Sequence, residues 1–159
     1  MHVLVPTDGS DLALEAARRG LALLGGASKA TILSVVGTLP LDTGGGIEGP
    51  IYTPEQEDEI RRSEQAQAAD AIVKTKAVLQ SVASPPAAVD ERTETGDPAG
   101  VICMVARDLG VDVIVVGSHG KGFLSRVLLG SVSEYVTRHA PCPVLVVRSH
   151  EHEAAAGTH

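Results

Sequence analysis

Aromatic side chains are scarce in this chain of 159 residues, which has one phenylalanine, two tyrosines and no tryptophan. Since 43% of the residues are hydrophobic, the interior must be filled by Val, Leu, Ile and Ala. No apolar run approaches the roughly 20 residues of a membrane-spanning helix, and the start of the chain lacks a signal-peptide pattern. These absences predict one cytoplasmic domain that makes no membrane contact.

Cysteine and positive charge are also in short supply. The two cysteines, Cys103 and Cys142, form neither a CxxC pair nor a metal-ligand cluster, so reduced, structural thiols are expected. Thirteen Lys and Arg against 20 Asp and Glu give a formal net charge of −7. This charge argues against non-specific binding to nucleic acid, although it does not exclude a local positive pocket for phosphates.

The two standard nucleotide fingerprints, the Walker A motif and G-x-G-x-x-G, are both absent. The stretch Val111–Val132 nevertheless has a glycine pattern of its own. An apolar run at 113–116 predicts a strand buried on both faces, which ends at Gly117. Gly117, Gly120 and Gly130 then form a G-x2-G-x9-G-S pattern that leads into a helix.

A strand, a glycine loop and a helix start, in this order, suit an anion. Bare backbone N–H groups converge there, and the helix dipole adds partial positive charge. We interpret the pattern as a phosphate cradle, in which a β-branched side chain at Gly130 would occupy the place of a phosphate and disfavour the backbone conformation. The alternative is structural, because glycine-rich loops are common and Ser131 with Glu134 fits a capping box.

Strands and helices are predicted to alternate along the whole chain. The expected strands are residues 3–5, 30–36, 87–95, 113–116 and 143–147, and the expected helices begin near Ser10, Thr53, Asp97 and Ser131. This order predicts an α/β fold, a doubly wound parallel sheet with helices on both faces. Residues 37–53 are predicted to form a loop, and the polar tail 149–159 is expected to be disordered.

Ligands bind such sheets beyond the carboxyl ends of the strands, where the strand order reverses. The first strand ends in Pro6-Thr7-Asp8 and the fourth in Gly117-Ser118-His119-Gly120, so the site is predicted where these ends meet. Asp8 could instead be only a turn residue, and His119 a loop histidine that faces water. The sequence places no general base or nucleophile, so no catalytic residue is predicted.

Two motifs carry a resemblance to a known family, VPTDGS near the start and VVGSHGKGFLSRVLLGSVSEYVTRHAPCPVLVV near the end. With the glycine spacing, they make the chain similar to universal stress proteins of the ATP-binding subclass. The resemblance covers residues 1–148 as a single nucleotide-binding domain. It implies a Rossmann-like, five-stranded parallel sheet of strand order 3-2-1-4-5.

The resemblance also implies which residues bind ATP. The adenine and ribose would contact Pro6, Thr7, Asp8 and Val35. The ribose and α-phosphate would lie against Val116, Gly117, His119 and Gly120. The β- and γ-phosphates would be held by Gly130, Ser131, Val132 and Ser133. Two further residues of the glycine loop complete the candidate set, Ser118 and Lys121, the latter as a countercharge to phosphate.

The function expected from the resemblance is that of an ATP-binding stress sensor or regulator, with Mg²⁺ or Mn²⁺ held mainly by the phosphates. Three alternatives stay open: slow ATP hydrolysis or phosphotransfer, binding of AMP or cyclic AMP in the same pocket, and a dimeric scaffold with a vestigial site. A homodimer is expected through the last strand, Pro143–Val147, because its apolar edge would otherwise be uncovered.

Overall fold

The computed structural model describes residues 1–38, 52–119 and 129–148, so the predictions for the centre of the 37–53 loop and for the 149–159 tail lie outside the described residues. Five strands alternate with four helices along these segments. The strands are β1 (His2–Pro6), β2 (Lys29–Val36), β3 (Ala88–Thr95), β4 (Val113–Gly117) and β5 (Val144–Val147). The helices are α1 (Asp11–Leu23), α2 (Pro54–Ser81), α3 (Pro98–Leu109) and α4 (Ser131–His139).

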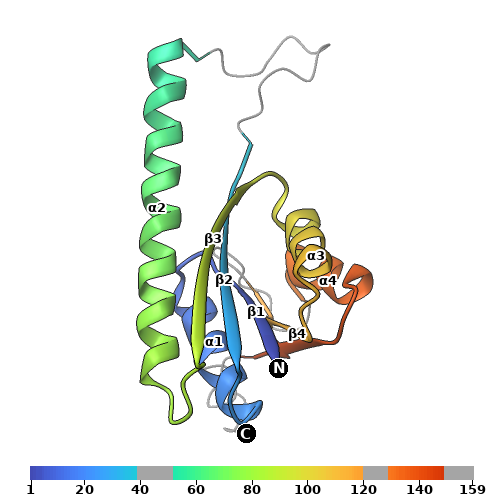
Figure 1. The fold of residues 1–159 in the computed structure, drawn as a ribbon. Helices are drawn as coiled ribbons and strands as arrows, with labels where there is room; N and C mark the ends of the chain where they lie inside the picture. The colour runs from blue at the N-terminus through green and yellow to red at the C-terminus, as the bar shows by residue number, and fades with distance from the viewer. Residues whose placement is uncertain (39–51, 120–128, 149–159) are drawn as a thin grey trace, which may run out of the picture.

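The strands form one sheet in the order β3-β2-β1-β4-β5, and every pairing is parallel. Helices α1 and α2 cover one face of this sheet, and α3 and α4 cover the other (Figure 1). The predicted doubly wound α/β fold and its strand order are therefore confirmed. Because α3 returns the chain to the other side of β1, the strand order reverses between β1 and β4.

Helices α1, α2 and α3 begin at capping residues that the sequence carries. Ser10 accepts a hydrogen bond from the amide of the first turn of α1, and Asp97 does the same for α3. Thr53 and Gln56 form a complete capping box at the start of α2. Gly110 ends α3 with φ 57°, a left-handed conformation that favours glycine. These local bonds explain why the helix starts were predictable.

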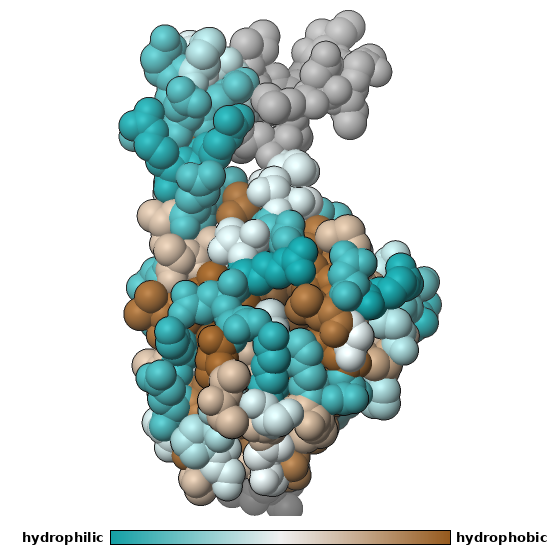
Figure 2. Space-filling model, viewed as in Figure 1, coloured by the Kyte–Doolittle hydropathy of each residue, from teal (hydrophilic) through white to brown (hydrophobic). Residues whose placement is uncertain are grey.

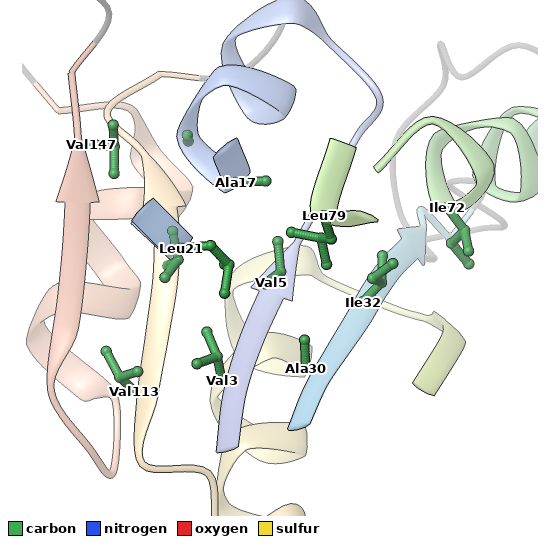
Figure 3. Packing of buried hydrophobic residues seen from close by; sticks show 12 residues of the cluster. Val3, Val5, Ala17, Leu21, Ala30, Ile32, Ile72, Leu79, Val113 and Val147 are labelled. Atoms are coloured by element: carbon green, nitrogen blue, oxygen red, sulfur yellow. The ribbon is translucent and has the colours of Figure 1, made fainter. Parts of the chain in front are cut away.

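The core consists of two apolar layers, one on each face of the sheet. Successive side chains along a strand point to opposite faces and so contribute to both layers. On the α1–α2 face, Val3 and Val5 of β1 pack with Leu21 of α1 and Leu79 of α2 (Figure 3). On the opposite face, Leu4 packs with residues of α3 and α4. Both faces of the central strands are thus buried, as expected for a parallel sheet.

Helix α2 is buried only in its second half. Its buried residues run from Ala68 to Leu79, whereas the first half is hydrophilic (Figure 2) and extends past the end of the sheet (Figure 1). Residues 55–64 are therefore mostly exposed to solvent. Within the described parts of the chain, neither α2 nor any other helix is long and apolar enough to cross a membrane.

The close approach of α1 to the sheet yields a first prediction, which concerns Gly20. A Cβ added at Gly20 would lie 2.3 Å from Cγ1 of Val115, a stiff side chain that is only 1% exposed. Replacing a helical glycine by alanine normally gains about 1 kcal/mol, but forced overpacking costs about 1–3 kcal/mol. We expect the steric cost to exceed the gain, so that Gly20→Ala lowers the free energy of unfolding in urea by up to about 2 kcal/mol.

A matched control for this substitution is Gly100→Ala, also in a helix. Its nearest neighbour would be Oδ2 of Asp97, 3.4 Å from the new Cβ, so no atom has to move far. Gly100→Ala should leave the stability unchanged or raise it. If Gly20→Ala were as stable as Gly100→Ala, the packing of Gly20 in α1 against Val115 in β4 would be less tight than the structure shows.

Candidate functional site

A cavity of about 340 Å³ lies at the carboxyl ends of β1 and β4, at the reversal of strand order. This is where open parallel sheets bind ligands, and the volume is at the lower end of the range for small-molecule pockets. The lining residues come from both strand ends, from β2 and from the starts of α1, α3 and α4. They are Pro6, Thr7, Asp8, Ala13, Leu33, Val35, Pro98, Ile102, Val116, Gly117, His119, Gly130, Ser131, Val132 and Ser133.

The loop between β1 and α1 forms one end of the cavity. The amide of Thr7 donates to the carbonyl of Leu33, at 2.9 Å, which continues the sheet pairing by one residue. The hydroxyl of Thr7 is buried and accepts from the amide of Gly9, at 3.1 Å. Gly9 has φ 72°, which only glycine adopts easily. Thr7 therefore shapes the loop with its side chain while it lines the cavity.

Asp8 is exposed, and its carboxylate is held by the residue that starts α1. Oδ1 of Asp8 accepts from the amide and the hydroxyl of Ser10, at 2.9 and 2.6 Å. Ser10 in turn caps α1 by accepting from the amide of Ala13. The turn role considered for Asp8 is therefore present in the structure, and it leaves the carboxylate in a defined orientation at the mouth of the cavity.

The walls of the cavity between its two ends are apolar. Val35 and Leu33 lie on the same face of β2, and Val116 extends the surface from β4. Pro98 and Ile102 close it from the first turns of α3. Such a surface, with polar groups only at its ends, suits a flat apolar ring such as a nucleobase.

The N-terminus of α4 forms the other end of the cavity. Gly130 is the N-cap and makes no side-chain hydrogen bond to the helix. The amides of Ser131, Val132 and Ser133 occupy the first turn, where an α-helix offers no internal acceptor. The first intrahelical bond runs from the amide of Glu134 to the carbonyl of Gly130, at 2.8 Å. This end of the cavity therefore presents backbone donors and the positive end of a helix dipole.

Two expectations about this helix start are corrected. Ser131 is the first helical residue and not the cap, and Glu134 pairs with Arg138 at 2.8 Å, so the proposed capping box does not form. Gly130 has φ −62° and ψ 155°, an extended conformation open to any residue, so the expected backbone penalty of a side chain there is wrong. Gly130 is nevertheless buried and lines the cavity, so a larger side chain there would press on its neighbours or enter the cavity.

A small hydrogen-bond network ties the two glycine segments together. The amide of Gly130 donates to the carbonyl of Ser118, at 2.8 Å, and the hydroxyl of Ser133 donates to the carbonyl of Gly117, at 2.6 Å. The amide of Ser118 donates to Val147 of β5, at 2.9 Å. Ser118 is therefore absent from the lining and instead holds Gly130 in place. The hydroxyl of Ser133 is also used within this network, so the group of Ser133 that could bind a ligand is its backbone amide.

The structure brings most of the predicted site residues together. Eleven of the 14 line the cavity: Pro6, Thr7, Asp8, Val35, Val116, Gly117, His119, Gly130, Ser131, Val132 and Ser133. Ser118 lies behind them, and Gly120 and Lys121 fall outside the described residues. Four further lining residues were not predicted from the sequence: Ala13, Leu33, Pro98 and Ile102. Only Leu33 carried a usable signal, since it is two residues before Val35 and so shares its face of the strand.

The charge at the cavity is low for a phosphate site. Among the described residues that line it, none is Lys or Arg. The described parts of the chain also contain no group of three or more His, Cys, Asp or Glu side chains that could hold a metal ion. Neutralisation of a phosphate by these residues therefore falls to backbone dipoles, and a divalent cation would have to be bound through the phosphates themselves.

The two cysteines lie away from the cavity, in the layer covered by α3 and α4. Burial raises the pKa of the Cys103 thiol. Burial raises the pKa of the Cys142 thiol, and the neighbouring Cys103 and Asp112 raise it further. A raised pKa leaves less thiolate at neutral pH, which disfavours redox chemistry and supports the structural interpretation.

Comparison with known proteins identifies the family. A model described as "Universal stress protein family" matches residues 1–148. The chain belongs to the universal stress protein family. The universal stress protein YxiE of Bacillus subtilis is 32% identical over 147 residues, which cover 92% of this chain and 97% of YxiE. A putative universal stress protein of Staphylococcus epidermidis is 50% identical over 64 residues, 40% of this chain and only 39% of that relative's length.

Solved structures of similar proteins share the fold. UspA of Lactobacillus plantarum superposes with a TM-score of 0.68 at 29% identity, covering 93% of this chain and 97% of UspA. The protein MJ0577 gives a TM-score of 0.73 at 30% identity, covering 94% and 96% of the two chains. Two structures described with bound cAMP and, from Arabidopsis thaliana, with bound AMP have TM-scores of 0.63 at 24% and 20% identity, and so show the fold alone.

Proposed function

We propose that this universal stress protein binds ATP in the cavity and acts as a nucleotide-dependent sensor or regulator in the stress response. The observation that carries the proposal is the joining of an apolar pocket to the glycine-capped start of α4. A nucleobase fits the first and a chain of phosphates fits the second. The 340 Å³ of the cavity accommodate the nucleoside, and the exposed Ser131 lies where phosphates would reach solvent.

In this proposal, the base lies between Val35 and the apolar wall from α3, and Asp8 accepts from the ribose or the base. Gly117 and His119 flank the ribose and the α-phosphate. The amides of Ser131, Val132 and Ser133 bind the β- and γ-phosphates. Mg²⁺ or Mn²⁺ would be held mainly by the phosphates. The cation would offset their negative charge, which no Lys or Arg of the described lining neutralises.

A second candidate ligand is AMP or cyclic AMP in the same pocket. Its support is that two proteins of this fold are described with these nucleotides bound. The amides at the start of α4 can bind a single phosphate or the terminal phosphates of ATP, so the ligand itself has to be identified. Mass spectrometry of the nucleotide that co-purifies with the protein distinguishes the two candidates directly by phosphate number.

The protein is expected to bind ATP with little turnover. Asp8, the carboxylate in the described lining, already accepts two hydrogen bonds from Ser10, and it belongs to the nucleoside end of the proposed site. Calorimetric titration with ATP and Mg²⁺ should therefore give binding, while phosphate release over many equivalents of ATP stays at the level of the buffer. Sustained turnover that His119→Ala or Asp8→Asn removes would instead favour the slow ATPase or phosphotransferase.

A homodimer through β5 forms part of the proposal. The sheet has two edges, and β3 carries charged side chains at its edge, such as Glu91 and Arg92, which discourage pairing. The sequence of β5 is Val-Leu-Val-Val, and the first three of these side chains are only half-buried. Pairing with a second copy would cover this apolar edge and satisfy its backbone groups.

A further inference from the structure

Helix α2 contacts the loop between β1 and α1, which forms one end of the cavity. The contact joins two threonines, Thr7 and Thr75, that are 68 residues apart in the sequence. Thr75 of α2 is completely buried, and its hydroxyl oxygen lies 2.8 Å from the hydroxyl oxygen of Thr7. The same hydroxyl is 2.8 Å from the carbonyl of Ala71, one turn earlier in α2. A buried hydroxyl pair of this kind holds its two elements at a defined distance, because breaking it leaves polar atoms unpaired.

A second contact presses α2 against the same loop. A Cβ added at Gly9 would lie 2.9 Å from Cβ and 3.0 Å from Cα of Ala71, so the two backbones are in direct contact. The loop passes α2 in the left-handed conformation of Gly9, at φ 72°. Ala71 and Thr75 are one turn apart on α2 and therefore touch the loop side by side.

These contacts bracket Asp8. On one side of it, Thr7 is bonded to Thr75 and accepts from the amide of Gly9. On the other side, Gly9 rests on α2, and Ser10 donates twice to the carboxylate of Asp8. The direction in which Asp8 points thus depends on a loop whose shape α2 supports.

We infer that Thr75 is a positioning residue for the nucleoside end of the site, acting through Thr7 to fix the loop that orients Asp8. This inference rests on the proposed function, since it assigns Asp8 to the ribose or base of a bound adenine nucleotide. Thr75 lies outside the cavity lining and touches no ligand in this arrangement. Replacing Thr75 is therefore expected to weaken ATP binding only when the carboxylate of Asp8 is present to contact the nucleotide.

The test compares Thr75→Val, which removes the hydroxyl and keeps the shape, with Thr75→Ser, which keeps the hydroxyl. Calorimetric titration with ATP and Mg²⁺ should show binding about tenfold weaker for Thr75→Val, as expected for the loss of one coupled hydrogen bond, and close to the parent for Thr75→Ser. The matched control is Thr31→Val. Thr31 is 2% exposed and its hydroxyl lies 2.8 Å from Nε2 of His2, outside the cavity lining. Thr31→Val should bind ATP like the parent.

A double-mutant cycle with Asp8→Asn separates positioning from a general loss of stability. If Thr75 acts through Asp8, Thr75→Val costs about tenfold in the parent and less than about twofold in the Asp8→Asn background. Equal costs in both backgrounds would overturn the inference, as would parent-like binding by Thr75→Val or a failure of Thr75→Ser to restore affinity. Absence of ATP binding by the parent protein is a different result, which would refute the proposed function itself.

Discussion

Gly130→Val is expected to abolish ATP binding while the fold remains intact. Gly130 caps α4 without a side chain, beside the amides of Ser131, Val132 and Ser133. An isopropyl group there would occupy the space that a phosphate needs in order to reach these donors. Loss of two or three charge-assisted hydrogen bonds, at about 1.5–3 kcal/mol each, corresponds to at least a hundredfold weaker binding.

The fold of this variant should remain, because the backbone at Gly130 has φ −62° and ψ 155°, but overpacking at this buried position should lower the free energy of unfolding by about 1–3 kcal/mol. A β-branched residue adopts this extended conformation readily. A thermal melt beside the calorimetric titration separates the two effects. The control is Gly37→Val, which follows β2 in a position where an added Cβ meets no atom within 4 Å. Parent-like ATP binding by a folded Gly130→Val would show that the phosphates bind elsewhere.

Val146→Pro is expected to convert the proposed dimer into a monomer. Beside β4, the carbonyls of Pro143 and Val147 accept from the amides of Ile114 and Ser118. Because backbone groups alternate in direction along a parallel strand, the N–H and C=O groups of Val144 and Val146 point away from the sheet. Proline at position 146 removes an outward donor in both copies and places its ring against the partner strand. The dissociation constant should rise at least about hundredfold, ~2.7 kcal/mol.

The control for this substitution is Val146→Thr, which keeps the N–H group and the β-branched shape. Sedimentation at micromolar concentration should show a dimer for the parent and for Val146→Thr, and a monomer for Val146→Pro. Proline on the outer side of an edge strand leaves the pairing of β5 with β4 in place, so the thermal melt should show a folded protein. A parent that is monomeric throughout would refute pairing through β5.

The elements and the strand ends that form the cavity could be predicted from the sequence because their signals are local. Thr53 and Gln56 lie in the same turn as the helix start they cap, and the apolar run at 113–116 needs no distant residue to be recognised as a strand. The spacing of Gly117 and Gly130 likewise indicated two residues that line the cavity. Alternation of strands and helices then restricts the topology strongly, since crossovers are right-handed.

Tertiary structure alone decided how these parts meet. The Thr7–Thr75 hydroxyl pair and the contact of Gly9 with Ala71 depend on how α2 packs against the sheet. The pattern of residues within α2 does not predict this packing. The bond from Ser133 to the carbonyl of Gly117 likewise arises from the placement of α4 beside β4. Periodicity and capping are short-range interactions, whereas such contacts depend on where each element lies after the chain has crossed the sheet.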